Sequence, residues 1–293
     1  MVNENALTVV GKANFHGDSR LFGMKLDDRR RHMHAMGKTG MGKTSFLLNM
    51  AVSDINNGHG FAFIDPHGDV TDDLLNYIPE HRIKDVIYFS PADMEYPLAF
   101  NVLGDVPKNQ RHIVGDGLVG VFQKIWADSW GPRLEYILRN AINTLLQYPD
   151  TTLLDIMKIL VDKEYRKEVV DYIDDPVLKS FWINEFNKYN DKMVTEAISP
   201  IQNKVGQFTS SPLIRNIIGQ KKSSFDIRKI MDERKILLMN LSKGATGEGG
   251  AQLLGAMMIT KMQLAAMSRV DIPQDDRKDF FAYVDEFQNF FPM

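Results

Sequence analysis

The stretch Gly37-Lys38-Thr39-Gly40-Met41-Gly42-Lys43-Thr44 decides the fold. It matches G-x-x-x-x-G-K-[ST] at every fixed position, between the predicted strand HMHAM and the predicted helix SFLLNMAV. Glycine lets the backbone curve so that successive N–H groups point at a phosphate, and the N-terminus of the next helix favours the same anion. We therefore predict an ATP-binding loop made of Gly37, Lys38, Thr39, Gly40, Met41, Gly42, Lys43, Thr44 and Ser45. Lys43 would contact the β and γ phosphates, and Thr44 would bind Mg²⁺.

A second motif lies near the C-terminus, where the apolar segment Phe280–Val284 is followed directly by Asp285 and Glu286. A parallel strand delivers the residues after it to the sheet edge where nucleotides bind. We expect Asp285 to hold Mg²⁺ through a water molecule. Glu286 would be catalytic with Lys43, because it would orient and polarise the attacking water. A kinase uses a substrate hydroxyl instead, so the second carboxylate favours NTP hydrolysis.

Short apolar runs predict an α/β fold with a mostly parallel sheet covered by helices on both faces. The predicted buried strands are Arg31–Met36, Phe61–Ile64, Val86–Phe89, Ile236–Asn240 and Phe280–Val284, the last in the centre of the sheet. Two further segments, Leu7–Val10 and Leu21–Leu26, predict a small antiparallel flap. Helices are expected from Gly42 and from Gly250 to Met267.

The middle of the chain has amphipathic helical periodicity and no predicted strand. Apolar residues from Leu134 to Leu146 follow the i, i+3, i+4, i+7 spacing after a first-turn proline, Pro132. Further helices are predicted over 153–161, 164–172, 176–188 and 192–205, and Pro200 is expected to kink or break the last one. The predicted organisation is an N-terminal β flap or linker (1–30), an ATPase core (31–102 and 227–293) and an all-helical insertion (103–226).

Composition narrows the class of protein. The 293 residues are 44% hydrophobic and 25% charged, which is typical of a soluble globular protein. Cysteine is absent, which excludes disulfides and thiolate metal sites. The sequence has no run of 18 apolar residues and no signal-peptide pattern at its start. We therefore expect a cytoplasmic location, or a position at the cytoplasmic face of a membrane complex.

A third segment, Phe61–Asp69 (FAFIDPHGD), predicts a strand followed by a Pro/Gly turn with two carboxylates. The simplest interpretation is a turn in which an aspartate side chain caps the backbone. His67 lies in this turn. Because no His or Cys at ligand spacing accompanies it, we interpret His67 as a turn residue.

Several segments together, RRRHMHAMGKTGMGKTSFL, FAFIDPHGD, the helical insertion, ILLMNLSKG and FFAYVDEFQNF, resemble the HerA–FtsK superfamily of P-loop motors. Within it, the chain most resembles the coupling ATPases of conjugative type IV secretion systems, from about Gly11 to Met293. The resemblance implies a RecA-like P-loop NTPase fold, with ATP and Mg²⁺ as ligands. It also implies DNA translocation by a homo-hexameric ring, with the insertion as an all-α domain that helps in substrate recognition.

The chain departs from this family in two respects. The N-terminal membrane helices common in coupling proteins are not found in the sequence. It also stops soon after Glu286, before the family's sensor residue and arginine finger. We therefore expect a C-terminally truncated core that hydrolyses ATP poorly alone and associates with itself through an exposed strand edge.

Charge bears on the DNA hypothesis. The formal net charge is −3, so bulk attraction to nucleic acid is not visible. Residues 1–50 nevertheless hold eight basic and four acidic residues. The triplet Arg29-Arg30-Arg31 is either a solvated turn or a phosphate-contacting patch. In a ring, six copies of the region 20–31, or of Lys221, Lys222, Arg228 and Lys229, could line a channel.

The leading hypothesis is therefore an ATP-driven DNA translocase or coupling ATPase. Three alternatives remain open at this point: a HerA-type DNA-processing translocase, an ATPase that acts on protein beside secretion-channel subunits, and a nucleotide-gated binding module without turnover. The sequence does not separate single-stranded from double-stranded DNA as the substrate.

Overall fold

A four-stranded parallel sheet organises the N-terminal and C-terminal parts of the chain. The computed structural model describes residues 7–17 and 19–290. The strands run in the order β4-β5-β3-β6, with bounds Gly60–Asp65 (β3), Val86–Phe89 (β4), Ile236–Asn240 (β5) and Phe280–Val284 (β6). Four of the five predicted strands are thus confirmed, although β4 and β6 are only partly buried. β6 lies at an edge of the described sheet, where the sequence predicts an exposed strand edge.

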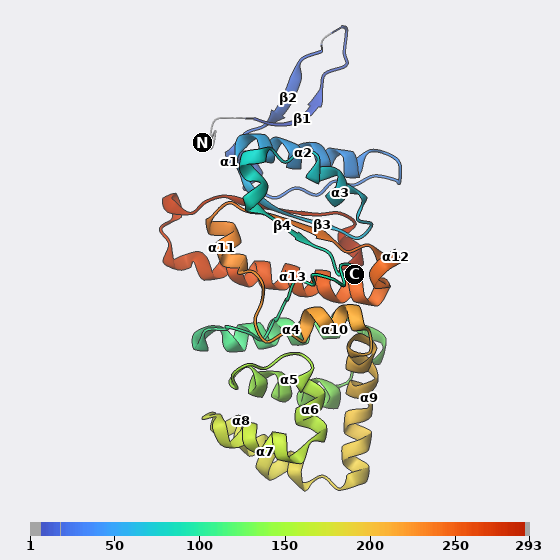
Figure 1. Ribbon diagram of the computed structural model, residues 1–293, viewed down its shortest axis with the longest axis vertical. Coiled ribbons are helices and arrows are strands. Elements are labelled where there is room, and N and C mark those ends of the chain that lie inside the picture. The colour runs from blue at the N-terminus through green and yellow to red at the C-terminus, as the bar shows by residue number, and fades with distance from the viewer. Residues whose placement is uncertain (1–6, 18, 291–293) are drawn as a thin grey trace. The chain divides into compact units, whose positions relative to one another are not determined.

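Two helices pack on one face of this sheet, α2 (Lys43–Asn57) and α3 (Asp69–Leu75) (Figure 1). The helix predicted to begin near Gly42 is confirmed. One core cluster joins the two helices to alternate residues of the strands: Met50, Ala51, Ile55, Val70, Leu74, Phe61, Phe63, Ile236, Leu238 and Tyr283. The intervening residues Ala62, Ile64, Leu237 and Met239 are also fully buried. Both faces of β3 and β5 are therefore buried from solvent, as their continuous apolar sequence predicts.

The predicted flap is present as an antiparallel hairpin of β1 (Thr8–Lys12) and β2 (Leu21–Met24), followed by α1 (Leu26–Arg29). Residues 1–6 of the predicted flap lie outside the described residues. The strand predicted over Arg31–Met36 is wrong. A strand needs a ladder partner, whereas this segment is mostly exposed, and His32 at φ 60 interrupts an extended run.

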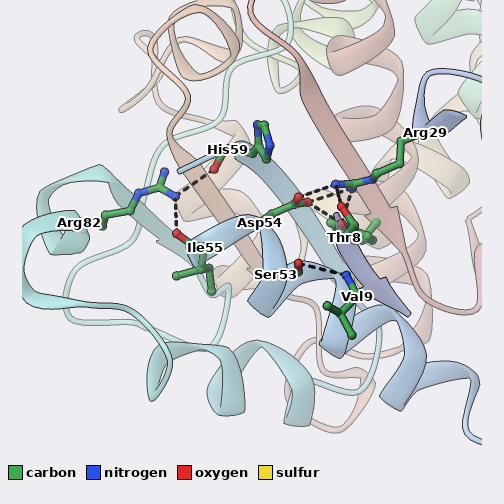
Figure 2. Close-up of polar contacts among 9 residues, drawn as sticks. Thr8, Val9, Arg29, Ser53, Asp54, Ile55, His59 and Arg82 are labelled. Atoms are coloured by element: carbon green, nitrogen blue, oxygen red, sulfur yellow. Dashed lines mark hydrogen bonds and ion pairs between the residues drawn. The ribbon is translucent and has the colours of Figure 1, made fainter. Parts of the chain in front are cut away.

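A buried polar network ties the start of the chain to the core (Figure 2). The Arg29 guanidinium donates to both carboxylate oxygens of Asp54 at 2.5 and 2.9 Å, to Thr8 Oγ1 at 2.8 Å and to Tyr283 Oη at 2.6 Å. It also lies 3.5 Å from the centroid of the Phe281 ring. Arg29 is buried, so for this residue both interpretations, the solvated turn and the phosphate contact, are wrong. Its charge is matched inside the protein by Asp54.

A second polar cluster joins α3 to β4 and β5. Tyr88 Oη donates to Asp72 Oδ1 at 2.5 Å and accepts from Asn240 Nδ2 at 2.9 Å. Burial, with the bond to the Asp72 carboxylate, raises the pKa of Tyr88 to about 12. The neutral phenol is therefore favoured in the folded state relative to the unfolded chain.

This shifted pKa predicts an alkaline loss of stability. The contribution of Tyr88 to folding is complete below pH 10, where tyrosine is neutral in both states, and is lost as pH rises toward about 12. Chemical unfolding across this range should show a steeper fall in the free energy of unfolding for the native protein than for Tyr88→Phe. Tyr77→Phe, at an exposed tyrosine, should follow the native curve. Equal slopes for the native protein and Tyr88→Phe would contradict the assignment.

The described residues of 103–226 form helices joined by loops and contain no strand, as predicted. Its main helices are α4 (Arg111–Ile125), α5 (Pro132–Leu145), α6 (Asp155–Val161), α7 (Lys163–Tyr172), α8 (Pro176–Ser180), α9 (Asp191–Thr209) and α10 (Pro212–Ile218). α5 contacts α4, α6 and α9 (Figure 1). Its predicted apolar face from Leu134 to Leu145 is buried. The predicted helix 176–188 is instead α8 followed by a π-helical turn, Phe181–Glu185, and a 3₁₀ turn, Phe186–Lys188.

Of the expected kink or break at Pro200, the break does not occur. α9 is one continuous helix from Asp191 to Thr209 with Pro200 inside it. Proline removes one backbone hydrogen bond, but Ile198, Ile201 and Val205 around it are buried. The apolar contacts on this face offset the missing bond.

The chain divides into two compact units. The first comprises 1–90, 227–242 and 269–287, and includes α11 (Ile227–Asp232). The second comprises 91–226, 243–268 and 288–293, and includes α12 (Lys243–Thr246) and α13 (Glu248–Ser268). The predicted boundary at 226/227 coincides with this division, whereas 91–102 and α13 group with the helical unit. Among the described residues, no helix is both long and apolar enough to span a membrane.

Candidate functional site

The predicted phosphate-binding loop is a glycine turn that ends at the first residue of α2. Gly40 and Gly42 have φ of 81° and 86°, in the left-handed region that glycine adopts without strain. An added Cβ would meet no atom within 4 Å at either glycine, so the curve faces open space. The Lys43 ammonium donates to the carbonyls of Gly37 at 2.9 Å and Lys38 at 3.3 Å. The loop therefore curves around the Lys43 ammonium.

The N-terminus of α2 supplies free donors at the same place. Helices leave their first N–H groups without intrahelical acceptors. Phe46 N donates to Gly42 O at 2.9 Å, but no acceptor for the N–H groups of residues 43, 44 and 45 is found in the part of the chain that the structure describes. The first turn carries no acidic residue. Its backbone donors and dipole are thus available to an anion.

The structure brings the two halves of the predicted site together. Thr44 Oγ1 donates to Asp285 Oδ2 at 2.8 Å, although the residues are separated by 241 positions in the chain. Asp285 is held directly after β6, where its N–H donates to Ile64 O at 3.1 Å. The hydroxyl and the carboxylate form a pair of hard oxygen ligands, the type that Mg²⁺ prefers. The residues present therefore fit a magnesium ion shared with a bound phosphate.

The turn after β3 has the aspartate cap expected from its sequence. The buried Asp65 carboxylate accepts from His67 N at 2.8 Å, Val70 N at 2.9 Å and Thr71 N at 3.2 Å. Gly68 has φ 95°, and a Cβ there would lie 2.4 Å from Asn240 Oδ1. The turn is fixed by this carboxylate and by a position that only glycine can fill.

Glu286 lies at the same edge of the sheet, in an uncommon backbone conformation. Its φ is 45°, and its N–H donates to Asp285 Oδ1 at 3.0 Å. Its Oε2 lies 3.2 Å from His67 Nε2. His67 is a turn residue, as predicted, but its contact with Glu286 was not foreseen. The sequence did not reveal that β3 and β6 pair. The two strands are parallel with Ile64 opposite Val284, so the residues that follow the two strands lie side by side.

Several residues of the predicted basic regions are paired with carboxylates. Arg30 binds Asp27 and Asp279 at 3.0 Å, and Arg228 binds Asp271 at 2.6 Å. Lys221 lies 4.0 Å from Asp150. Pairing with carboxylates reduces the positive charge that these residues could offer to a polyanion.

The chain matches no protein-family model and no curated protein sequence. It is similar to solved structures of the conjugative coupling protein TrwB. The unbound bacterial form TrwBdeltaN70 has a TM-score of 0.62 and 15% identity, over 91% of this chain and 57% of that one. TrwB with ADP and Mg²⁺ has a TM-score of 0.61 and 16% identity, over 91% and 59%. TrwB with the ATP analogue ADPNP has a TM-score of 0.57 and 15% identity, over 86% and 56%.

At this level of identity the likeness is one of fold. The chain has the α/β fold of these TrwB structures, and the predicted resemblance is confirmed at the level of fold. The chain spans less than two thirds of the length of these TrwB structures.

Proposed function

We propose that the chain is the ATP-hydrolysing motor region of a coupling-type DNA translocase. The observation that carries the proposal is the bond between Thr44 and Asp285, which joins the loop before α2 to the end of β6. It assembles a phosphate cradle and a carboxylate pair at one edge of a parallel sheet, where nucleotides bind in folds of this kind. Structures of TrwB with ADP and Mg²⁺, and with an ATP analogue, support the choice of nucleotide.

Each residue of the site has a separate role in this proposal. The loop 37–42 and the N–H groups of residues 43–45 bind the phosphates, because they present backbone donors around one concave turn. Lys43 adds a positive charge that can leave the loop carbonyls for the phosphate oxygens. Glu286 accepts a hydrogen bond from the attacking water and so directs it at the terminal phosphate.

Magnesium would be held by Thr44 and Asp285, where it would neutralise phosphate charge. No group of three or more His, Asp or Glu side chains suited to a metal is found among the described residues. Two protein ligands suffice if phosphate and water complete the shell, which is the usual arrangement for Mg²⁺ at a nucleotide.

DNA as the substrate rests on the likeness to a conjugative coupling protein, and a hexameric ring rests on the family resemblance. The charge distribution adds little support, since Arg29, Arg30 and Arg228 are paired within the chain. A ring of six copies would bring any remaining basic side chains together around a channel. Contacts of this kind with phosphates weaken steeply with salt.

ATP turnover with and without DNA tests the proposal. We expect single- or double-stranded DNA to raise the hydrolysis rate of the purified chain at low salt, and to raise it less at moderate salt, because phosphate contacts release counterions. Lys43→Ala serves as the control for contaminating ATPases. If the chain hydrolyses ATP but DNA changes nothing at either salt, the DNA substrate is wrong and a motor that acts on protein is favoured.

A further inference from the structure

The contact between His67 and Glu286 joins two strand ends at the proposed catalytic edge. The Nε2 atom of His67 lies 3.2 Å from Oε2 of Glu286. With a hydrogen on Nε2, the imidazole can donate to this carboxylate, which only accepts. We propose that His67 is a positioning residue that holds the Glu286 carboxylate in the orientation needed to direct water. This inference rests on the proposed ATPase function.

The imidazole is presented from a rigid turn. The His67 N–H is fixed by the Asp65 carboxylate at 2.8 Å, and that carboxylate is fully buried. The same carboxylate accepts from Val70 and Thr71 at the start of α3. At the next position, the left-handed Gly68 lies against Asn240. The backbone that carries the imidazole is therefore held from two directions before any ligand binds.

Glu286, in contrast, needs external support. Its side chain is 37% exposed, and a free glutamate loses considerable rotamer entropy when it is held in one orientation. Its backbone at φ 45° lies in the left-handed region, which is strained for residues other than glycine. A contact from the neighbouring strand end restricts the orientation of the carboxylate. Catalytic groups commonly require such support to stay in productive geometry.

The inference predicts a change in turnover without a change in nucleotide affinity. His67 is not among the residues proposed to bind phosphate, so its removal should lower kcat and leave KM for ATP unchanged. We expect His67→Ala to reduce kcat about tenfold, since a misplaced catalytic group costs one to two orders of magnitude. His67→Gln retains an N–H donor at the end of a flexible side chain and should recover most of the lost rate.

Steady-state ATP hydrolysis by the whole chain tests this, with five proteins compared: native, His67→Ala, His67→Gln, Glu286→Gln and His81→Ala. His81 is an exposed histidine on the 3₁₀ turn Glu80–Asp85 and serves as the matched control, with kinetics expected to equal the native protein. Thermal unfolding of each variant checks that the fold is retained.

The possible results distinguish the catalytic role proposed for Glu286 from the positioning role proposed for His67. If Glu286→Gln leaves turnover unchanged, the role proposed for Glu286 fails and the role of His67 fails with it. If Glu286→Gln abolishes turnover while His67→Ala retains the native kcat, only the positioning role is overturned. A rise in kcat in His67→Ala, or a loss that His67→Gln does not restore, would also overturn it.

Discussion

Replacement of Lys43 by alanine is expected to lower ATP turnover by at least about 100-fold and to weaken nucleotide binding, because it removes a preorganised positive charge from the phosphate cradle. The ammonium already sits inside the loop, bonded to the carbonyls of Gly37 and Lys38. A phosphate oxygen would replace those carbonyls as its acceptor. The alanine variant therefore loses both the charge and the group that organises the empty loop.

Glu286→Gln supplies the contrasting result. The amide is almost the same size as the carboxylate but is a poor acceptor of a proton, so we expect ATP binding to persist while turnover falls. Binding is measured by titration with a fluorescent ATP analogue, and turnover by phosphate release. Lys84→Ala, at an exposed lysine of the same unit, should behave as the native protein in both assays. Native turnover in both Lys43→Ala and Glu286→Gln, with ATP binding retained in Glu286→Gln, would favour a binding module without catalysis.

The strands could be predicted from sequence because burial on both faces leaves a continuous apolar run, as in Phe61–Ile64 and Ile236–Asn240. The segment Arg31–Met36 (RHMHAM) is not a continuous apolar run, because it mixes polar and apolar residues. Such a pattern does not reveal whether a neighbouring strand exists to pair with it. The motif residues Thr44 and Asp285 could be named because their chemistry is local to two short segments.

The missed features depend on distant pairing. Arg29 is one of three consecutive arginines and has no local signal that distinguishes it from Arg30 or Arg31. Its burial follows from Asp54 on α2 and Tyr283 on β6, which are brought to it only by the fold. The same limit applies to His67, whose partner Glu286 becomes its neighbour through the parallel register of β3 and β6.

The largest stability loss is expected at this buried pair, in the variant Asp54→Ala. The side chains of Arg29 and Asp54 are 3% and 0% exposed, so removal of the carboxylate leaves a guanidinium charge without compensation in the interior. Breaking a buried pair from one side typically costs about 3–5 kcal/mol. We therefore expect the midpoint of urea unfolding to fall steeply. Arg29→Ala should cause a loss of similar size, because Asp54 would then be the unpaired charge.

A matched control and a double variant show whether charge compensation is the cause. Arg30 makes exposed pairs with Asp27 and Asp279 on the same segment, and Arg30→Ala should cost only about 0–1 kcal/mol. Replacing both buried partners, as Arg29→Met with Asp54→Leu, removes the unpaired charge and should destabilise the protein less than Asp54→Ala alone. If the two buried changes simply add, the coupling is absent. The Tyr283 hydroxyl bonds both Arg29 and Asp54 and lies two residues before Asp285. Without coupling between Arg29 and Asp54, we would not expect this pair to hold Tyr283 in place.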